Sequence, residues 1–210
     1  MKQPASNYDL QVDIGRKIFL EFDQELLIRK FRLEADPDRI YLTYLNTPCR
    51  ICRGTGRIDE LHGGTWQECR DFGTVMTVYD LLCHHQGSVA PALYGTWCTV
   101  GTFVVTGVTS TGGFTKKYAA RFDRDPEALK QACLALGGRI LPSMAGADLT
   151  CRFQVTPYFP VLMQFWHSDE EFPAQVVLLW DRNSMAFLHF ETTFYLQGDL
   201  LGRLLQAFPS

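Results

Sequence analysis

The chain contains 210 residues, of which 46% are hydrophobic and 20% are charged, and its formal net charge is -3. A chain of this length and apolar content can bury a substantial core, so composition argues against a disordered protein and favours a single domain over residues 1–210, with two small lobes as the alternative. Neither acidic nor basic residues form a long block, and no apolar run reaches the roughly 18 residues of a membrane-spanning helix. The sequence therefore predicts no binding to nucleic acid and no insertion into a membrane.

Seven cysteines are distributed along the chain: Cys49, Cys52, Cys69, Cys83, Cys98, Cys133 and Cys151. An odd number of cysteines, in a chain that can build its own core, argues against a secreted disulfide scaffold. The first residues also lack an apolar stretch of signal-peptide length. We therefore predict reduced thiols and a cytoplasmic location.

The N-terminal half is predicted to begin with helical structure and to continue with strands. Apolar residues recur at helical spacing over residues 8–33, and Asp23 is placed to cap a second helix inside that segment. Short apolar runs separated by turn residues then predict a small N-terminal hairpin at about residues 40–59. A further helix is predicted over residues 72–86, with Cys83 on its buried face.

The C-terminal half is predicted to combine helices with a sheet. A short helix is expected around residues 116–122, and the next helix is capped by Asp125 and ends at Gly137. The last helix is expected to start at Asp199, after Gly198 changes the chain direction.

Strands account for most of the remaining C-terminal half. Residues 88–114 are interpreted as an irregular connection with one short strand at residues 102–106. Four further strands are predicted as an antiparallel meander, at residues 149–156, 161–166, 175–180 and 185–190. The predicted fold class is α+β, with this meander packed against several helices.

The first candidate site is the segment Cys49-Arg-Ile-Cys52-Arg-Gly54-Thr-Gly56. Its spacing is similar to the Cys-x-x-Cys-x-Gly-x-Gly pattern of zinc-binding repeats in Hsp40-type co-chaperones, so Cys49 and Cys52 are candidate zinc ligands. A structural zinc site needs four ligands, and the chain holds one copy of the motif. The residues that could complete the set are His62, Cys69 and the Cys83-His84-His85 cluster. If residues 49–53 form a strand, however, the two thiols point to opposite faces and cannot share an ion.

The second candidate site is the connection between the strands predicted at residues 161–166 and 175–180. An imidazole and several carboxylates gather there beside aromatic anchors, and the candidate ligand-binding residues are Trp166, His167, Asp169, Glu170 and Glu171. Such a loop can bind a hard cation or supply an acid–base pair. A solvated hairpin loop explains the same composition, so both interpretations stand.

Two histidine-containing segments complete the list of candidates. His189 and Glu191 lie at the end of the last predicted strand and could face the same cleft, although a Glu near the start of a helical turn is also favourable. His84 and His85 close the helix predicted over residues 72–86. An imidazolium there interacts favourably with the carbonyl end of the helix dipole, so a structural role is favoured over a ligand role.

A family resemblance rests on three segments of the C-terminal third and on three glycine turns. The segments are Thr156-Pro-Tyr-Phe-Pro-Val-Leu-Met-Gln-Phe-Trp166, Asp169-Glu-Glu-Phe172 and Leu178-Leu-Trp-Asp181, and the turns are Gly95-Thr-Trp97, Gly137-Gly138 and Gly146-Ala-Asp148. With these features the chain resembles a bacterial and archaeal family known only as domain of unknown function 3786. The resemblance implies a protein found mostly in anaerobes, in some members fused to an iron–sulfur segment, and it implies no activity. This chain lacks a closely spaced run of four cysteines that would ligate such a cluster.

The usual nucleotide-binding and hydrolase signatures are absent from the sequence. The leading hypothesis is a binding module, with a pocket near residues 166–172 and the His189/Glu191 strand end that holds a small molecule or a segment of a protein partner. The sequence does not identify a cofactor, which stays unknown.

Two other classes of function remain open at this point. One is an enzyme in which Glu170 or Glu171 acts as general base together with His167 or His189. The other is a zinc-dependent interaction module that uses Cys49 and Cys52, for which metal content is the deciding observation.

Overall fold

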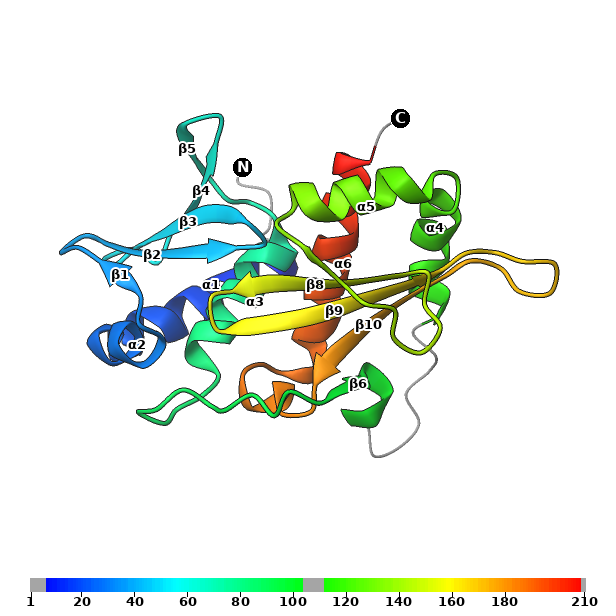
Figure 1. The fold of residues 1–210 in the computed structure, drawn as a ribbon. Helices are drawn as coiled ribbons and strands as arrows, with labels where there is room; N and C mark the ends of the chain where they lie inside the picture. The colour runs from blue at the N-terminus through cyan, green and yellow to red at the C-terminus, as the bar shows by residue number, and fades with distance from the viewer. Residues whose placement is uncertain (1–6, 104–111, 209–210) are drawn as a thin grey trace. The chain divides into compact units, whose positions relative to one another are not determined.

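The computed structural model describes residues 7–103 and 112–208, and the chain divides into two compact units. Unit 1 comprises Met1–Ala92 and Met185–Leu196, and unit 2 comprises Leu93–Ser184 and Gln197–Ser210. The described residues form six α-helices and two antiparallel sheets of five strands each (Figure 1), which confirms the predicted α+β class. The assignment of residues 1–210 to a single domain stays a prediction.

Three helices of unit 1 lie where helical periodicity predicts them: α1 (Asn7–Glu21), α2 (Gln24–Phe31) and α3 (Phe72–Cys83). The carboxylate of Asp23 accepts a hydrogen bond of 3.0 Å from the Leu26 amide, so the predicted cap does divide the first helical segment. Helices α1 and α3 pack against each other. A Cβ on Gly15 would come within 2.9 Å of the Tyr79 ring, so the close approach of α1 to α3 requires glycine there.

The sheet of unit 1 follows chain order, with every neighbouring pair antiparallel. Its strands are β1 (Glu34–Ala35), β2 (Arg39–Tyr44), β3 (Thr47–Cys52), β4 (Ile58–His62) and β5 (Thr65–Glu68). The predicted N-terminal hairpin is therefore part of a larger sheet. In β2 the buried residues are Ile40, Leu42 and Tyr44, which places one face of the sheet against the core.

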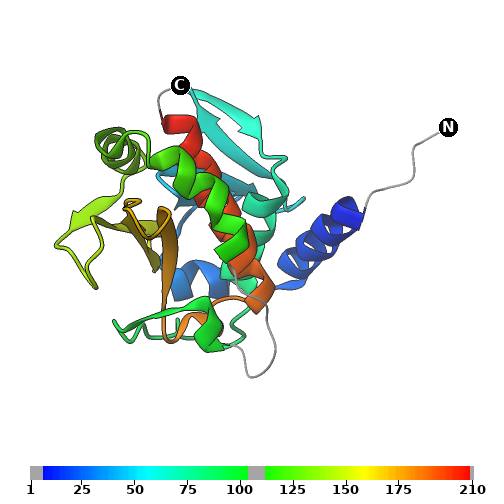
Figure 2. The ribbon, with the colours of Figure 1, turned by 90° about the vertical axis from the view of Figure 1, so that its right-hand side faces the viewer.

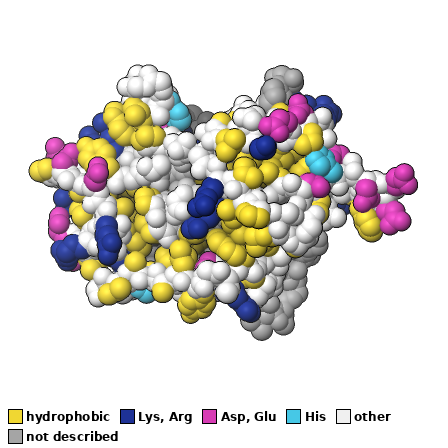
Figure 3. Space-filling view, in the orientation of Figure 1, with side chains coloured by type: hydrophobic (Ala, Val, Ile, Leu, Met, Phe, Trp, Pro, Cys, Tyr) yellow, Lys and Arg dark blue, Asp and Glu magenta, His cyan; other side chains and the backbone are white. Residues whose placement is uncertain are grey.

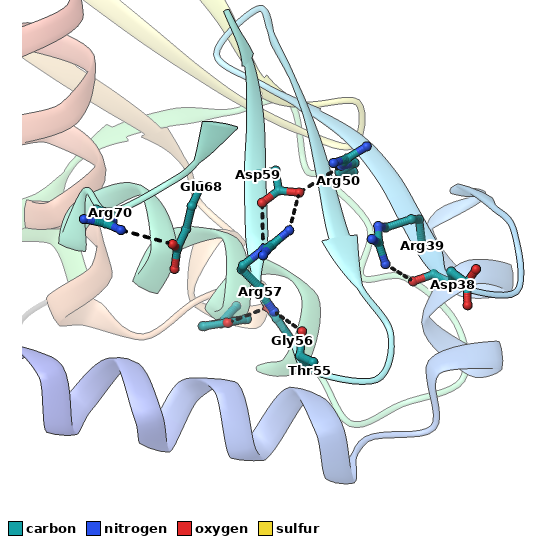
Figure 4. Close-up of polar contacts among 10 residues, drawn as sticks. Asp38, Arg39, Arg50, Thr55, Gly56, Arg57, Asp59, Glu68 and Arg70 are labelled. Atoms are coloured by element: carbon teal, nitrogen blue, oxygen red, sulfur yellow. Dashed lines mark hydrogen bonds and ion pairs between the residues drawn. The ribbon is translucent and has the colours of Figure 1, made fainter. Parts of the chain in front are cut away.

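Ion pairs link β3 and β4 on the face opposite Ile51 (Figure 4). Asp59 is 3% exposed, and its carboxylate oxygens lie 2.9 Å from Arg50 Nε and 2.9 Å from Arg57 Nε. Burial acts to raise the pKa of Asp59, but the two guanidinium groups outweigh burial, and the pKa of Asp59 is lowered. The ion pairs with Arg50 and Arg57 thus offset the cost of burying the Asp59 carboxylate.

Unit 2 contains the second sheet, whose strand order is β6-β10-β9-β8-β7. These strands are β6 (Trp97–Thr99), β7 (Arg139–Leu141), β8 (Leu149–Thr156), β9 (Phe159–Trp166) and β10 (Gln175–Asp181). Strands β8, β9 and β10 are consecutive antiparallel neighbours, which confirms three strands of the predicted meander. The predicted apolar face of β8 is observed at Cys151, Phe153 and Val155, which are buried, but Thr150 and Thr156 on the opposite face are buried as well.

Helices cover this sheet within unit 2. They are α4 (Gly112–Phe122), α5 (Pro126–Ala135) and the C-terminal part of α6 (Phe190–Ala207). Asp125 caps α5 through a 2.9 Å hydrogen bond from the Ala128 amide, as predicted. Helices α4 and α6 lie on the same side of the sheet (Figure 2), and a Cβ on Gly198 would lie 3.4 Å from the Phe114 ring of α4.

Two predictions for the C-terminal segment are wrong. Residues 185–190 do not form a fourth meander strand; a short 3-10 helix, Ser184–Ala186, precedes a loop, and α6 already begins at Phe190. Gly198 consequently lies inside α6 and does not redirect the chain. The predicted strand rested on a short apolar run, and such a run does not distinguish a strand from a buried loop that leads into a helix.

The strand predicted at residues 102–106 falls partly outside the described residues. Its first two residues belong to a 3-10 helix, Val100–Phe103, and are not a strand. No helix among the described residues is long and apolar enough to cross a lipid bilayer.

Candidate functional site

A cavity of ≈ 490 Å³ lies within unit 1, bounded by α1, α3 and the first turns of α6. This volume is within the range of small-ligand sites, about 300–1,000 Å³. Its walls include the apolar side chains of Ile14, Ile18 and Met76. Three potential ligands of a metal ion also line it, from two elements far apart in the sequence: Asp80, His84 and His189.

The three polar side chains converge closely. Nδ1 of His189 lies 2.6 Å from Oδ1 of Asp80 and 3.2 Å from Nδ1 of His84. Nδ1 of His84 lies 3.9 Å from Oδ1 of Asp80. One atom of each residue therefore faces a common point, and all three atoms lie within 4.8 Å of one another.

Helix α3 sets the positions of Asp80 and His84. The two residues are four positions apart, so their side chains emerge from the same face one turn apart. The His84 amide donates to the Asp80 carbonyl at 2.9 Å and closes the last turn. Nζ of Lys30 donates to the His85 carbonyl at 2.6 Å, which ties the end of α3 to α2. Burial lowers the pKa of Lys30.

The second oxygen of Asp80 fixes the start of α6. Oδ2 accepts hydrogen bonds from the His189 amide at 2.7 Å and from the Thr192 hydroxyl at 2.6 Å. A carboxylate from α3 thus fixes the residue before α6 and a side chain in its first turn, where the helix dipole also favours a negative charge. These contacts place His189 beside Asp80, and they leave Oδ1 directed toward the two imidazoles.

The ring of His84 is fixed by a backbone contact. Its Nε2 lies 3.0 Å from the Met185 carbonyl oxygen. A carbonyl can only accept, so Nε2 carries the proton, and Nδ1 of the neutral ring presents a lone pair to Asp80 and His189. Metal-binding histidines in proteins are commonly oriented by such a hydrogen bond from the other ring nitrogen.

The distances are compatible with coordination of a metal ion. Two ligands bound to zinc at about 2.0–2.1 Å in tetrahedral geometry lie about 3.3 Å apart. The separations of 3.2 and 3.9 Å lie near that value, whereas the 2.6 Å separation is a hydrogen bond between His189 Nδ1 and Asp80 Oδ1 that an ion would replace and lengthen. Exposure of the side chains rises from 11% for Asp80 through 23% for His84 to 65% for His189, so the site opens toward solvent.

The loop predicted as a site, residues 166–172, lies in unit 2 and connects β9 to β10. Nδ1 of His167 lies 3.0 Å from Oδ1 of Asp123, and the Ser168 hydroxyl donates to Oδ2 of Asp123 at 2.6 Å. The Ser168 hydrogen bond is the largest contribution to a lowered pKa of Asp123. His167 is thus held by a neighbouring carboxylate, and Trp166 is half-buried at the end of β9.

The acidic residues of this loop project into solvent. Asp169 accepts hydrogen bonds from the amides of Glu171 and Phe172 at 2.8 and 2.7 Å and so forms the turn itself. Glu170 and Glu171 are exposed. In Figure 3 acidic side chains gather at the outer tip of the β9–β10 hairpin. These contacts are those of a solvated hairpin loop.

The predicted site residues do not come together within one unit. His189 and Glu191 belong to unit 1 and line its cavity, whereas residues 166–172 belong to unit 2. Glu191 lies in the first turn of α6, a favourable position for a carboxylate at a helix N-terminus.

Cys49 and Cys52 both lie in β3, three residues apart. Side chains at that spacing point to opposite faces of a strand, so the two thiols cannot bind the same zinc ion. Cys49 is 1% exposed, in the core, and Cys52 is half-buried on the other face. Cys69 is also buried, and burial raises its pKa to about 12.

The thiol of Cys52 is expected to react faster with alkylating reagents than the thiol of Cys83. A hydrogen bond with the Thr55 hydroxyl contributes most to a lowered pKa of Cys52, whereas burial raises the pKa of Cys83 to about 12. Iodoacetamide near neutral pH should therefore alkylate Cys52 at least about tenfold faster than Cys83, as measured by peptide mass spectrometry. Thr55→Val should slow only the reaction of Cys52; equal rates for the two thiols would contradict this prediction.

Sequence reasoning identified His189 but did not join it to its partners. Asp80 was not singled out, and His84 was considered as a ligand only together with Cys49 and Cys52, with a structural role at the helix end favoured. A carboxylate and an imidazole four residues apart on a predicted helix were an available signal. The sequence gives no sign that His189 lies beside His84, because the two residues are 105 positions apart.

Comparison with known protein families gives a match to most of the chain. No curated protein and no solved structure matches the chain. The sequence profile of the family described as "Domain of unknown function (DUF3786)" matches residues 23–203, a span that includes Asp80, His84 and His189 but not α1. Because the match covers most of the chain, this protein belongs to the DUF3786 family.

Proposed function

We propose that this protein is a binding module whose ligand is a divalent transition metal ion of the zinc type. Oδ1 of Asp80, Nδ1 of His84 and Nδ1 of His189 would hold the ion. The observation that carries the proposal is the convergence of these three atoms inside the unit 1 cavity. The hydrogen bonds from His84 to Met185 and from Thr192 to Asp80 supply the outer contacts that orient such ligands.

The donor set favours a particular class of ion. Two imidazoles and one carboxylate suit zinc, cobalt, nickel or iron, whereas calcium and magnesium prefer oxygen ligands alone. Structural zinc sites are usually closed by four protein ligands, and sites with three protein ligands keep a position open for another molecule. The 65% exposure of His189 supports an open site of this second kind.

The proposal retains the binding function expected from the sequence and assigns it to unit 1. Of the residues predicted for ligand binding, it uses His189 directly, with Glu191 at the edge of the same cavity. A cytoplasmic location is part of the proposal. It is supported by the seven cysteines, none of which is joined in a disulfide bond, as expected in a reducing compartment.

Titration of the full chain with Co²⁺ tests the proposal. Co²⁺ replaces zinc in N/O sites and absorbs visible light. Its absorption is stronger in four- or five-coordinate sites than in six-coordinate ones. We expect saturation at about one equivalent, with a dissociation constant in the micromolar range or below, and full reversal by Zn²⁺. A linear, unsaturable response, or no visible absorption, would contradict the proposal.

A further inference from the structure

We infer that the open position of the metal site takes the carboxylate of a monoanionic amphiphile, whose apolar tail lies along α1 and α3. This inference rests on the proposed metal site and names the class of molecule that completes it. Three features of the cavity support it: the charge of the site, the chemistry of its walls and the exposure of those walls.

The net charge of the metal-bound site favours a ligand with a single negative charge. A divalent ion bound by the Asp80 carboxylate and two neutral imidazoles retains one positive charge. Among the residues that the structure describes, no lysine or arginine lines the cavity, and Glu191 is a second acid on its wall. One carboxylate would neutralise the metal site. A second carboxylate on the same molecule would find no cation and would meet Glu191, so a dianion is disfavoured.

The walls of the cavity are suited to an apolar tail. Ile14 and Ile18 of α1 line the cavity, yet they are 60% and 46% exposed. Met76 and Tyr79 of α3 and Tyr195 of α6 continue the apolar lining. A hydrocarbon chain that covers these side chains would remove apolar surface from water, which is favourable in proportion to the area buried.

The test compares three carboxylates on the Co²⁺-loaded full chain, followed by visible absorption. Acetate has the donor without a tail, octanoate has both, and suberate has the same chain length as octanoate but carries a second carboxylate. We expect octanoate to bind at least about 30-fold more tightly than acetate, because its additional methylene groups are partly buried. Suberate should bind within about threefold of acetate, because its second charge opposes burial of the tail.

A matched pair of variants locates the tail. Ile18→Asn should weaken octanoate binding by about fivefold or more, while the affinities for Co²⁺ and for acetate stay unchanged. Leu20→Asn is the control: Leu20 is 40% exposed on the same helix but does not line the cavity, so its replacement should leave octanoate binding unaltered.

The outcomes separate this inference from the proposed function. Absence of Co²⁺ binding would contradict the metal site itself. Normal Co²⁺ binding with equal affinities for octanoate and acetate, or with suberate as tight as octanoate, would overturn the amphiphile inference and leave the metal site standing. An equal effect of the two asparagine variants would also overturn it.

Discussion

Replacing His84 by alanine is expected to lower the affinity for Co²⁺ by at least about 100-fold. The imidazole contributes one of three protein ligands, and its Nδ1 is fixed toward the other two by the hydrogen bond from Nε2 to the Met185 carbonyl. Two remaining ligands, Asp80 and His189, do not hold a transition metal ion tightly. Titration of the variant followed by visible absorption measures the loss.

His85→Ala provides a matched control for this variant. His85 is the next residue in the chain, and its backbone carbonyl, not its side chain, accepts the hydrogen bond from Lys30. Its side chain does not line the cavity, so the variant should bind Co²⁺ as the parent does. Circular dichroism of both variants should show a folded protein. Equal affinities of His84→Ala and the parent would remove His84 from the site.

Replacing Asp181 by alanine is expected to lower the free energy of unfolding by about 3 kcal/mol. Asp181 is 1% exposed at the end of β10, and it accepts hydrogen bonds from three amides. The donors are Tyr94 at 3.0 Å, Gly95 at 2.7 Å and Asn183 at 2.8 Å. Hydrogen bonds to a charged group contribute about 1.5–3 kcal/mol each, and the exposed donor residues Tyr94 and Gly95 regain part of this from water, so we expect a total loss near the lower end for three bonds. Urea denaturation followed by tryptophan fluorescence measures the change.

Asp169→Ala is the control for this prediction. Asp169 also accepts hydrogen bonds from backbone amides, those of Glu171 and Phe172, but it lies at an exposed hairpin tip. Water can replace the carboxylate there, so the expected loss is below about 1 kcal/mol. If the two variants lost the same stability, burial of Asp181 would not be the cause of the effect.

Local signals in the sequence predict much of the fold. Asp23 and Asp125 cap helices as expected, because an N-cap depends on residues within one turn. The apolar face of β8, with Cys151, Phe153 and Val155 buried, likewise follows from strand geometry. These features need no knowledge of distant residues, and they are the ones that sequence reasoning places correctly.

The start of α6 shows why other features could not be predicted. The carboxylate that fixes the start of this helix is not in the preceding turn but belongs to Asp80, which is 109 residues away from His189. Because the sequence does not show this long-range contact, the apolar residues Phe187 and Leu188 suggest a strand. The same long-range contact builds the candidate site, so one missed interaction explains both the wrong strand and the missed ligands.

The most direct test of the metal site is anomalous diffraction at the zinc edge, from crystals grown with one equivalent of Zn²⁺. The account predicts one peak at about 2.0–2.2 Å from Oδ1 of Asp80, Nδ1 of His84 and Nδ1 of His189. A peak at the cysteines of β3 would contradict it. So would the absence of a peak beside Asp80 and His84 when both side chains are well ordered in the electron density.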